Sequence, residues 1–561
     1  MALEESIKKY ALQNAIHFNG KCNPGSVIGK IISEYPEVKK NMKKTMQLIN
    51  DTCKEISSQT LKTSTEQLKA IDPSLLEKKK GEKKEGLKDL KNAKENEVVV
   101  RIAPSPSGPL HIGHAYGASL NYEYAKKYKG KFIVRIEDTN PNNIYPQGYE
   151  LIEEDTKWLT ENHVDKLIIQ SSRLDIYYEY AKKLVDIGKA YVCNCNSDEW
   201  RENKNNKIAC KCRNLEIKEQ QLRFYKLFKE YSDGEAILRL KTNIKDKNPA
   251  MRDFGIMRIN EQIHPKTGKK NRVWPLMVLS VAIDDHLLGI THVMNGKEHA
   301  DNAKKEAMIM ELLGWTPPEY LHWGRINFEG FSVSASKTKL AIEQNNYEGW
   351  DDIRLPFLPA LRKKGYQPKA FRKFAIQIGL SLNDKTVSME EFWKNINFLN
   401  KEIIEPTSNR FFFINDPIEI EIENAPTKEF ELDLHPDKVS GGRLFSTNTK
   451  FIITKNDFEL IKENEEFRLM DCLNFNMKNN KFLFTSEDYK NFKGKKIIHW
   501  LPKDENFKVE ILMNDNKWIK GFGENNLKYI KIGDIIQFER FGFCKLQSIE
   551  NNIYKFWFTH K

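Results

Sequence analysis

The pattern of hydrophobic and polar positions divides the chain into regions that predict different kinds of secondary structure. Residues 1–77 have helical periodicity, as in IGKIISEYPEVKKNMKKTMQLI, and predict an N-terminal helical domain. Residues 78–97 are densely charged and hold few large apolar residues, so we expect a charged linker there. From residue 98 apolar runs alternate with helical stretches, and from residue 402 the pattern becomes that of short strands.

The region that begins at residue 98 has the pattern of a doubly wound sheet. EVVVRIA and KFIVRIEDTN are continuous apolar runs typical of buried parallel strands, and LNYEYAKKYKG between them predicts a helix closed by Gly130. A strand, a helix and a strand at this spacing predict a βαβ unit. Further along, PLMVLSVAIDDHLLGITHVMNG, residues 275–296, predicts more strands.

The remaining boundaries follow from the same changes of pattern. We place the two halves of the doubly wound, Rossmann-like domain at residues 98–190 and 273–345, with an insertion at 191–272 between them. A helical region, 346–401, precedes residues 402–561, where PIEIEIENAP alternates with period two and further short strands predict β-barrel domains. The expected fold class is therefore a multidomain α/β protein.

Length and charge narrow the class of protein. A chain of 561 residues is too long for one core, which agrees with three or more domains. We find no apolar run of about 18 residues and no signal peptide, so we expect a cytoplasmic protein without a membrane partner. The net charge of +12 suggests a polyanionic partner, although a composition rich in Lys, Asn and Ile is an alternative explanation.

The string RIAPSPSGPLHIGH, residues 101–114, follows the first strand and holds three prolines and a glycine before a helix that we expect to start near Leu110. Ligands of open α/β sheets lie beyond the carboxyl ends of the strands. The free N–H groups at the start of this helix are expected to attract phosphate.

Two histidines stand at the start of that helix. His111 and His114 are three residues apart and share a face, while Gly113 leaves room for a bulky ligand. Two imidazoles there suit hydrogen bonding to a phosphoryl group that gains charge in a transition state. Metal ligation and simple exposure to solvent are the alternatives.

The eight cysteines fall into two groups. Cys22, Cys53, Cys472 and Cys544 are scattered and are expected to be reduced thiols. The other four form two CxC pairs separated by a polar loop, which suits tetrahedral zinc, with reduced thiols near a turn as the alternative. These four are Cys193, Cys195, Cys210 and Cys212.

Several long strings resemble one known family. PSPSGPLHIGH resembles the HIGH motif of class I aminoacyl-tRNA synthetases, and RIAPSPSGPLHIGHA followed by FIVRIEDTNP resembles the glutamyl/glutaminyl subgroup. YALQNAIHFNGKCNPGSVIGKII is similar to the N-terminal helical domain of archaeal-type glutamyl-tRNA synthetases. WPLMVLSVAIDDHLLGITHV, KKIIHWLP and IIQFERFGFCKL fit the same subgroup, so the resemblance covers nearly the whole chain.

The resemblance implies an ATP-dependent ligase that attaches L-glutamate to tRNA through a glutamyl adenylate, with Mg²⁺ accompanying ATP. It implies that His111, Gly113 and His114 bind ATP and that SVSASKTK, residues 332–339, is the mobile KMSKS-type loop that holds the triphosphate. In this loop Ser336, Lys337 and Thr338 match the motif, and Lys337 is the expected catalytic cation beside the two histidines.

The amino-acid site is also implied by the resemblance. Glu137 can receive the substrate's ammonium group and Arg101 can face a carboxylate, although these two charges could instead form an ion pair with each other. The expected amino-acid-binding residues are Arg101, Ala103, Ser105, Glu137, Met277 and Asn295.

Three positions depart from the family pattern. Tyr116 stands where the family has a basic residue, Ser334 where the KMSKS motif has lysine, and Asn295 where glutamyl enzymes have arginine. The lost charged hydrogen bond at 295 is worth about 1.5–3 kcal/mol. Arg258 or Arg272 could compensate. Glutamate is still the expected substrate; the alternatives are a glutaminyl-tRNA synthetase, a tRNA-binding protein without activation, or a paralogue with altered chemistry.

The resemblance also assigns roles to the domains. The insertion would bind the acceptor end of tRNA, with structural zinc holding it, and the region 346–401 would contact the stem. The domains in 402–561 would bind the anticodon of tRNA for glutamate, and for glutamine as well in cells that amidate afterwards. A monomer is expected.

Overall fold

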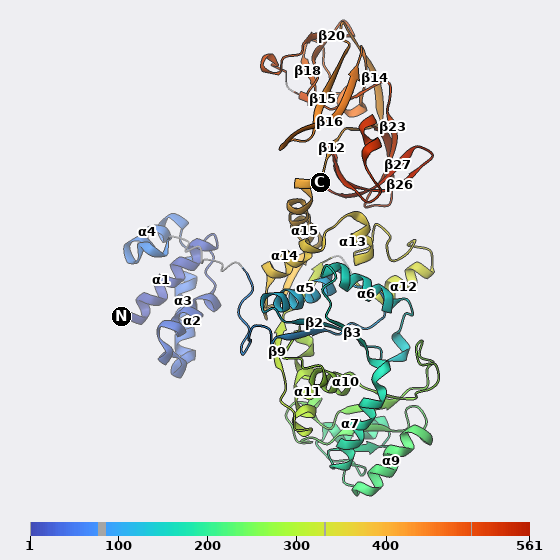
Figure 1. Cartoon of the computed structure of the whole chain (residues 1–561). Helices are drawn as coiled ribbons and strands as arrows, with labels where there is room; N and C mark the ends of the chain where they lie inside the picture. Colours follow the sequence, from blue (N-terminus) through green and yellow to red (C-terminus); the bar gives the residue numbers. More distant parts are fainter. Residues whose placement is uncertain (1, 77–85, 330–332, 495) are drawn as a thin grey trace. The chain divides into compact units, whose positions relative to one another are not determined.

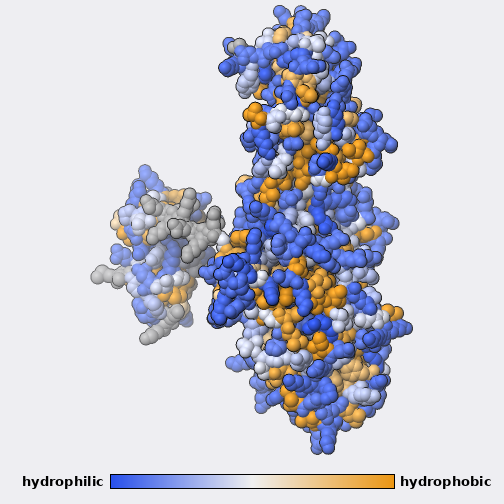
Figure 2. Space-filling model, in the orientation of Figure 1, coloured by the Kyte–Doolittle hydropathy of each residue, from blue (hydrophilic) through white to orange (hydrophobic). Residues whose placement is uncertain are grey.

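The computed structural model describes residues 2–76, 86–329, 333–494 and 496–561. It divides into two compact units, Met1–Glu85 and Gly86–Lys561 (Figure 1). Among the helices within these ranges, none is both long and apolar enough to cross a membrane. Figure 2 shows hydrophilic side chains over much of the visible face, with apolar patches between them.

The first unit is helical, as its periodicity predicts. Its helices are α1 (Ala2–His17), α2 (Pro24–Glu34), α3 (Met42–Ser57) and α4 (Leu61–Ile71), and they enclose a core that includes Ile7, Leu12, Ile31, Ile49 and Leu68. Cys22, just before α2, forms a disulfide with Cys53 on α3, with Cα atoms 5.1 Å apart. The prediction of a reduced thiol is therefore wrong for this pair, because helix packing joins residues that the sequence separates; Cys472 and Cys544 are free, as expected.

The second unit contains the predicted parallel sheet. Strands β1 (Val99–Ile102), β2 (Lys131–Ile136) and β3 (Lys166–Ile169) are parallel in that order, and β8 (His292–Gly296) pairs in parallel with β9 (Glu319–Trp323). Thr291 exchanges hydrogen bonds with Val99 at 2.9 and 3.0 Å, which places β8 on the other side of β1 from β2. The strand order therefore reverses between β1 and β8, where doubly wound sheets bind ligands.

Helices surround this sheet, and two local expectations need correction. The stretch expected to add strands instead forms the helix α10 (Met277–Leu287) before β8; Val278 to Asp285 are all buried, so no amphipathic period marks the helix. Helix α5 (Ile112–Lys127) ends before Gly130, and the left-handed residue is Lys129 (φ 49°). Gly130 is needed because a Cβ there would collide with the carbonyl oxygen of Val98.

The insertion folds on an antiparallel sheet of its own, in the order β4 (Ala190–Cys193), β5 (Ile237–Leu240), β6 (Gly255–Ile259) and β7 (Val273–Pro275). Helices α7 (Leu174–Asp186) and α9 (Ile217–Lys229) pack with it around buried Trp274. Other helices of this unit are α6 (Gly148–Leu159), α8 (Ser197–Asn205), α11 (Ala300–Leu312), α12 (Ala335–Glu343), α13 (Leu358–Lys364), α14 (Pro368–Ile378) and α15 (Met389–Ile404).

The C-terminal region is β-rich, as predicted. One seven-stranded sheet has the order β12-β25-β26-β27-β23-β24-β13. Its two edges, β12 (Arg410–Phe411) and β13 (Phe413–Asn415), are separated only by Phe412, so the sheet is a nearly closed barrel. Its other strands are β23 (Phe507–Leu512), β24 (Trp518–Gly523), β25 (Ile535–Phe538), β26 (Gly542–Glu550) and β27 (Ile553–His560).

The chain enters this barrel, leaves it to form the second seven-stranded sheet, and then returns. The second sheet has the order β21-β18-β19-β20-β14-β17-β22, beside the hairpin of β15 (Lys428–His435) and β16 (Lys438–Thr447). The strands of that sheet are β14 (Pro417–Glu423), β17 (Lys450–Thr454), β18 (Glu466–Leu469), β19 (Asn474–Lys478), β20 (Lys481–Ser486), β21 (Lys496–Ile498) and β22 (Leu501–Pro502). The predicted fold class is confirmed.

Candidate active site

The turn between β1 and α5, residues 103–114, brings two imidazoles together; we call it the β1–α5 corner. The rings of His111 and His114 stack with centroids 3.7 Å apart. Nδ1 of His111 accepts hydrogen bonds from the backbone N–H groups of Gly113 (3.0 Å) and His114 (3.4 Å). Nδ1 of His114 faces the backbone N–H of His111 at 3.5 Å. Each ring therefore carries its hydrogen on Nε2, where it can donate to a ligand.

This geometry corrects one expectation about the helix start. The helix begins at Ile112, and the N–H groups of Gly113 and His114 are capped by the His111 side chain. The backbone N–H of Ile112 donates to the carbonyl of Pro356 at 3.2 Å. These backbone groups are therefore already hydrogen-bonded within the protein and are not free for a phosphate.

Both imidazoles are neutral at physiological pH. Desolvation by the surrounding protein lowers the pKa of His114 to about 4, although its side chain remains accessible to solvent. Desolvation together with the neighbouring His114 lowers the pKa of His111 to about 2. A neutral imidazole still donates through Nε2–H, so the corner offers two hydrogen-bond donors without a net charge.

The corner lies against the start of α12, which carries the second predicted motif. A Cβ on Gly108 would lie 2.9 Å from the ring of Trp350 and 3.2 Å from Cβ of Ala335, the first residue of α12. Ser334 caps α12 by accepting from the backbone N–H of Lys337 at 3.4 Å. The Lys337 side chain is exposed, two residues after Ala335.

A cavity of about 500 Å³ opens at the corner and reaches the carboxyl ends of β1, β2 and β8. Nine of the predicted site residues line it: Arg101, Ala103, Ser105, His111, Gly113, His114, Glu137, Met277 and Asn295. Ser336, Lys337 and Thr338 are not among its described lining residues, so the α12 motif adjoins the cavity without entering it.

The cavity is lined by several charged residues, and we call Arg101, Glu137, Asn295 and Glu306 the charged pocket. Arg101 is buried and donates from Nε and Nη2 to Asp285 at 3.1 and 2.9 Å. It pairs with Asp285 and not with Glu137, so the alternative of an Arg101–Glu137 ion pair is wrong. Asp285 also pairs with buried Arg135, which leaves a net positive charge on this three-residue network.

Glu137 lines the same cavity at the end of β2. Burial raises the pKa of Glu137 to about 7, against the lowering influence of Arg135 and Arg101. A bound cation would favour its ionised form, so Glu137 suits an ammonium group.

Asn295 is held by its neighbour on β9. Its Oδ1 accepts a hydrogen bond from Nδ1 of His322 at 2.7 Å, across the parallel pairing of β8 and β9. Because the oxygen is occupied, Asn295 offers its NH₂ group to a ligand, which suits an oxygen acceptor.

The arginines considered as compensation for position 295 are engaged elsewhere. Arg272 pairs with Glu261 and donates to the carbonyl of Tyr231 at 2.7 Å, and Arg258 donates to Asn140 at 2.6 Å. Neither belongs to the described lining of the cavity, so in this structure neither supplies the charge missing at position 295.

Sequence reasoning missed three charged residues of the cavity, Glu298, Glu306 and Arg325. Arg325 follows β9, and Glu306 lies inside α11, a helix whose other charged residues are mostly on its surface. None of the three stands in one of the recognised strings, and a single charge within a mixed helix has no pattern that marks it as buried.

Tyr116 lines the same cavity as the two imidazoles, but its polar atom and its ring are engaged by neighbouring residues. Its hydroxyl donates to the carbonyl oxygen of Gly379 at 2.9 Å, and its ring packs edge-on against Trp323 at 5.4 Å. It is buried and its role is packing between α5 and the end of α14.

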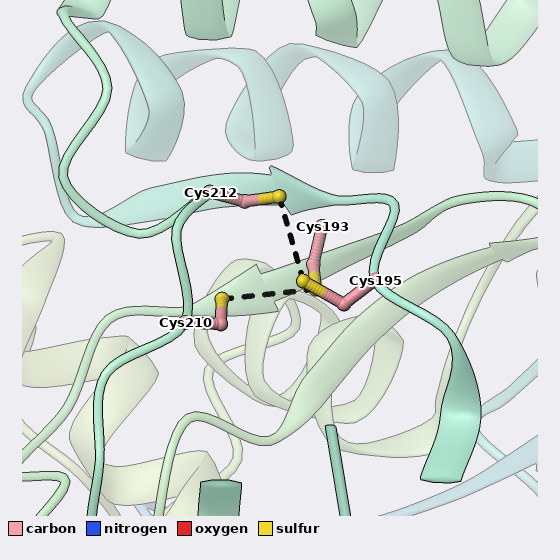
Figure 3. Close-up of side chains that lie close together, drawn as sticks. All are labelled: Cys193, Cys195, Cys210 and Cys212. Atoms are coloured by element: carbon pink, nitrogen blue, oxygen red, sulfur yellow. Dashed lines mark hydrogen bonds between the residues drawn. The ribbon is translucent and has the colours of Figure 1, made fainter. Parts of the chain in front are cut away.

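The four clustered cysteines converge in the insertion. Figure 3 shows Cys193, Cys195, Cys210 and Cys212 pointing toward one another, and their sulfur atoms all lie within 4.8 Å of one another. Two sulfur pairs, Cys193–Cys210 and Cys195–Cys212, are 3.9 and 3.7 Å apart. A tetrahedral zinc with Zn–S bonds of about 2.3 Å places its ligands about 3.8 Å apart, so the donor set and spacing fit zinc.

Cationic side chains surround this cluster. Arg223 approaches the sulfur of Cys212 at 3.6 Å, and Arg239 stacks on Trp200, which belongs to the same buried cluster. Arg223 also pairs with Glu219 at 2.8 Å, which holds its guanidinium group in place beside the cluster. Four thiolates around a divalent ion carry a net charge of about −2, so a cation held there is favourable.

Comparison with known proteins agrees with this architecture. The catalytic-domain model of "tRNA synthetases class I (E and Q)" matches residues 97–406, and two anti-codon binding domain models of the same family match residues 408–495 and 497–547. Glutamate–tRNA ligases of Methanocaldococcus jannaschii and Methanosphaera stadtmanae are 40% and 38% identical to the chain, over 100% of each protein. A glutamate tRNA ligase crystal structure from Elizabethkingia meningosepticum is 20% identical, covers 56% of this chain and 70% of that one, and has a TM-score of 0.41, too low to carry a conclusion.

Proposed function

The chain belongs to the class I tRNA synthetases of the E and Q subgroup, and we propose that its charged pocket and β1–α5 corner together form the site of amino-acid activation. The chain is an ATP-dependent ligase that attaches glutamate to tRNA. One observation carries the proposed site: a single cavity joins the carboxyl ends of β1 and β8 to both imidazoles, at the switch point of the sheet.

In the proposed mechanism the charged pocket holds glutamate. Glu137 binds its ammonium group, and Arg101 and the NH₂ group of Asn295 bind carboxylate oxygens. The α-carboxylate oxygen attacks the α-phosphorus of ATP, and the bond to pyrophosphate breaks. The terminal ribose hydroxyl of tRNA then takes the glutamyl group and AMP leaves. Positioning and charge stabilisation suffice, without a covalent enzyme intermediate.

The β1–α5 corner acts on the phosphate that changes. We propose that Nε2–H of His111 and of His114 donate to the α-phosphate as it gains charge, with Gly113 leaving room for the nucleotide. Lys337, with Ser336 and Thr338, moves over the β- and γ-phosphates and stabilises the leaving pyrophosphate. Arg325 is a further cation in reach of the triphosphate. Mg²⁺, when bound together with ATP, would supply further neutralisation of the phosphate charge.

Pyrophosphate exchange with each amino acid tests the proposed site. Exchange is expected with glutamate when total tRNA is present, and the assay is repeated without tRNA because family members often need tRNA for activation. Exchange with glutamine alone would instead support a glutaminyl enzyme, which Asn295 keeps as the second candidate, since its NH₂ group also fits an amide oxygen. No exchange with any amino acid would indicate a tRNA-binding protein without activation.

We propose that the cysteine cluster holds one structural zinc ion that fixes the insertion, which binds the acceptor end of tRNA. Freshly purified protein is expected to contain about one zinc per chain, and Cys195→Ser is expected to lose it. Cys472→Ser, which changes a cysteine outside the cluster, is the matched control and should keep its zinc. Zinc-free protein with an unchanged Tm would contradict the proposal.

The C-terminal β-rich region is the proposed anticodon-binding part of the chain. The barrel and the second sheet of 408–561 bind the anticodon region of tRNA for glutamate, and for glutamine where amidation follows. The chain acts in the cytoplasm as a monomer, which sedimentation of the purified protein with and without tRNA would test.

A further inference from the structure

Glu306 is a buried carboxyl group with an unused hydrogen-bonding atom. It lies on α11, has 3% of its surface exposed, and lines the same cavity as Arg101, Glu137 and Asn295. Within the described part of the chain its Oε2 has no hydrogen-bond partner. A buried polar atom without a partner is costly, and a bound ligand that satisfies it removes that cost.

The charged and titratable groups that face Glu306 come from four other elements. The electrostatic environment of its carboxyl group is set by Arg101 first, then by Asp285, Arg135 and Glu137, and it acts in turn on the hydroxyl of Tyr320. Asp285 already engages both arginines. The Tyr320 hydroxyl interacts with this carboxyl group, but neither the hydroxyl nor Oε2 makes a hydrogen bond of ordinary geometry within the described ranges. Because both arginines are paired with Asp285, Glu306 has no cation of its own among these neighbours.

We propose that Glu306 is a specificity-determining residue, whose unpartnered Oε2 hydrogen-bonds the side-chain carboxylate of the substrate glutamate beside Arg101. The inference rests on the proposed function of the charged pocket. It explains how the pocket binds a second carboxylate although Asn295 supplies no positive charge there: Glu306 contributes a hydrogen-bond donor while it is protonated.

The protonation state of Glu306 decides whether this residue strengthens or weakens glutamate binding. Burial is the main cause that raises the pKa of Glu306, to about 7. Below that pH the carboxylic acid donates its proton to the substrate's carboxylate. Above it the ionised group repels the same carboxylate, so glutamate affinity falls as pH rises. Glutamine does not share this loss, because its NH₂ group can donate to an ionised carboxylate.

Glu137 titrates in the same range with the opposite effect, since its ionised form binds the ammonium group. The experiment must therefore remove the pH dependence that Glu137 contributes to glutamate binding. Glu306→Gln keeps Glu137 and keeps a neutral donor at position 306. The kcat/KM for glutamate of this variant, divided by that of the unchanged protein, therefore reports the titration of Glu306 alone.

We expect that ratio, measured by tRNA-dependent pyrophosphate exchange, to be flat below about pH 7 and to rise about tenfold per pH unit above it. Glu311→Gln, on the exposed face of the same helix, is the matched control and should give a ratio that does not change with pH. A flat ratio for Glu306→Gln would overturn the proposal. Absence of glutamate exchange by the unchanged protein at about pH 7 would instead defeat the proposed function itself.

A second measurement uses the unchanged protein and does not depend on the variant folding. Glutamate binding in the presence of tRNA is followed by calorimetry in two buffers of different ionisation enthalpy at about pH 8, where Glu137 is already ionised. Uptake of close to one proton per bound glutamate is expected. Release of protons, or no exchange, would overturn the role of Glu306.

Discussion

The β1–α5 corner and the charged pocket share one cavity but are built in different ways. The corner is one contiguous stretch, residues 103–114, that holds its imidazoles through its own backbone N–H groups. The pocket takes single residues from β1, the end of β2, β8 and α11, and two of them are held by partners distant in the sequence, Arg101 by Asp285 and Asn295 by His322. The corner is therefore a local structure, and the pocket is a product of the whole fold.

The two regions also differ in how they carry charge. The imidazoles of the corner are neutral near pH 7, because desolvation by the surrounding protein lowers their pKa values to about 2 and about 4. The pocket contains two carboxyl groups, Glu137 and Glu306, whose pKa values lie near 7. Phosphate chemistry should consequently be insensitive to pH near neutrality, whereas recognition of the amino acid should depend on it.

Loss of a corner imidazole gives the largest expected effect. His114→Ala should slow adenylate formation about 10²–10³-fold, the usual loss when a donor to a developing charge is removed. The KM for glutamate should change little, because the charged pocket is intact. Single-turnover measurement of adenylate formation with saturating substrates checks this.

His163→Ala, which changes an exposed histidine elsewhere, is the control and should react like the unchanged protein. The slow step of His114→Ala should also be flat between about pH 6 and 8, since the imidazoles titrate only at about 4 and 2. A variant that weakened glutamate binding and left the chemical step alone would abolish the distinction between corner and pocket.

Lys337 lies on α12, in a distant part of the chain from the β1–α5 corner. Its replacement should slow adenylate formation somewhat less than His114→Ala does. We expect Lys337→Ala to slow adenylate formation about 10²-fold and to leave tRNA binding unchanged. Rapid-quench assays and tRNA filter binding measure the two quantities. Lys337→Arg keeps the charge and should recover most of the rate; equal losses in both quantities for Lys337→Ala would refute a role on the leaving group.

Asn295→Arg changes the charged pocket and should improve glutamate binding, whereas the preceding variants impair adenylate formation. Arginine adds a charged hydrogen bond to the substrate's carboxylate, worth about 1.5–3 kcal/mol, so the KM for glutamate should fall about tenfold or more. Asn295→Gln, which keeps a neutral amide, should not improve glutamate binding. Glutamine should gain nothing from Asn295→Arg, and an equal gain for both amino acids would mean that position 295 faces their shared α-carboxylate.

The difference between corner and pocket also explains what the sequence could predict. The imidazoles, the first strands and the cysteine pairs are local patterns, and the structure brings each of these groups together as expected. The helix α10 was mistaken for strand, because a segment buried on every side has no period, and Glu306 stayed hidden in a charged helix. The disulfide of Cys22 and Cys53 likewise depends on how helices pack.

Tyr116→Phe should have the smallest effect on adenylate formation. It tests whether the phosphate-binding surface extends along α5 beyond His114. Tyr116 lies two residues after His114, at a position where the family pattern has a basic residue, yet its hydroxyl bonds the carbonyl of Gly379 and its ring packs on Trp323. Tyr116→Phe should therefore lower the free energy of unfolding by about 1 kcal/mol, through the lost hydrogen bond, and leave adenylate formation within about twofold. Denaturant unfolding and single-turnover kinetics measure the two effects. A large loss of rate with unchanged stability would show that the phosphate-binding surface extends along α5 beyond the imidazoles.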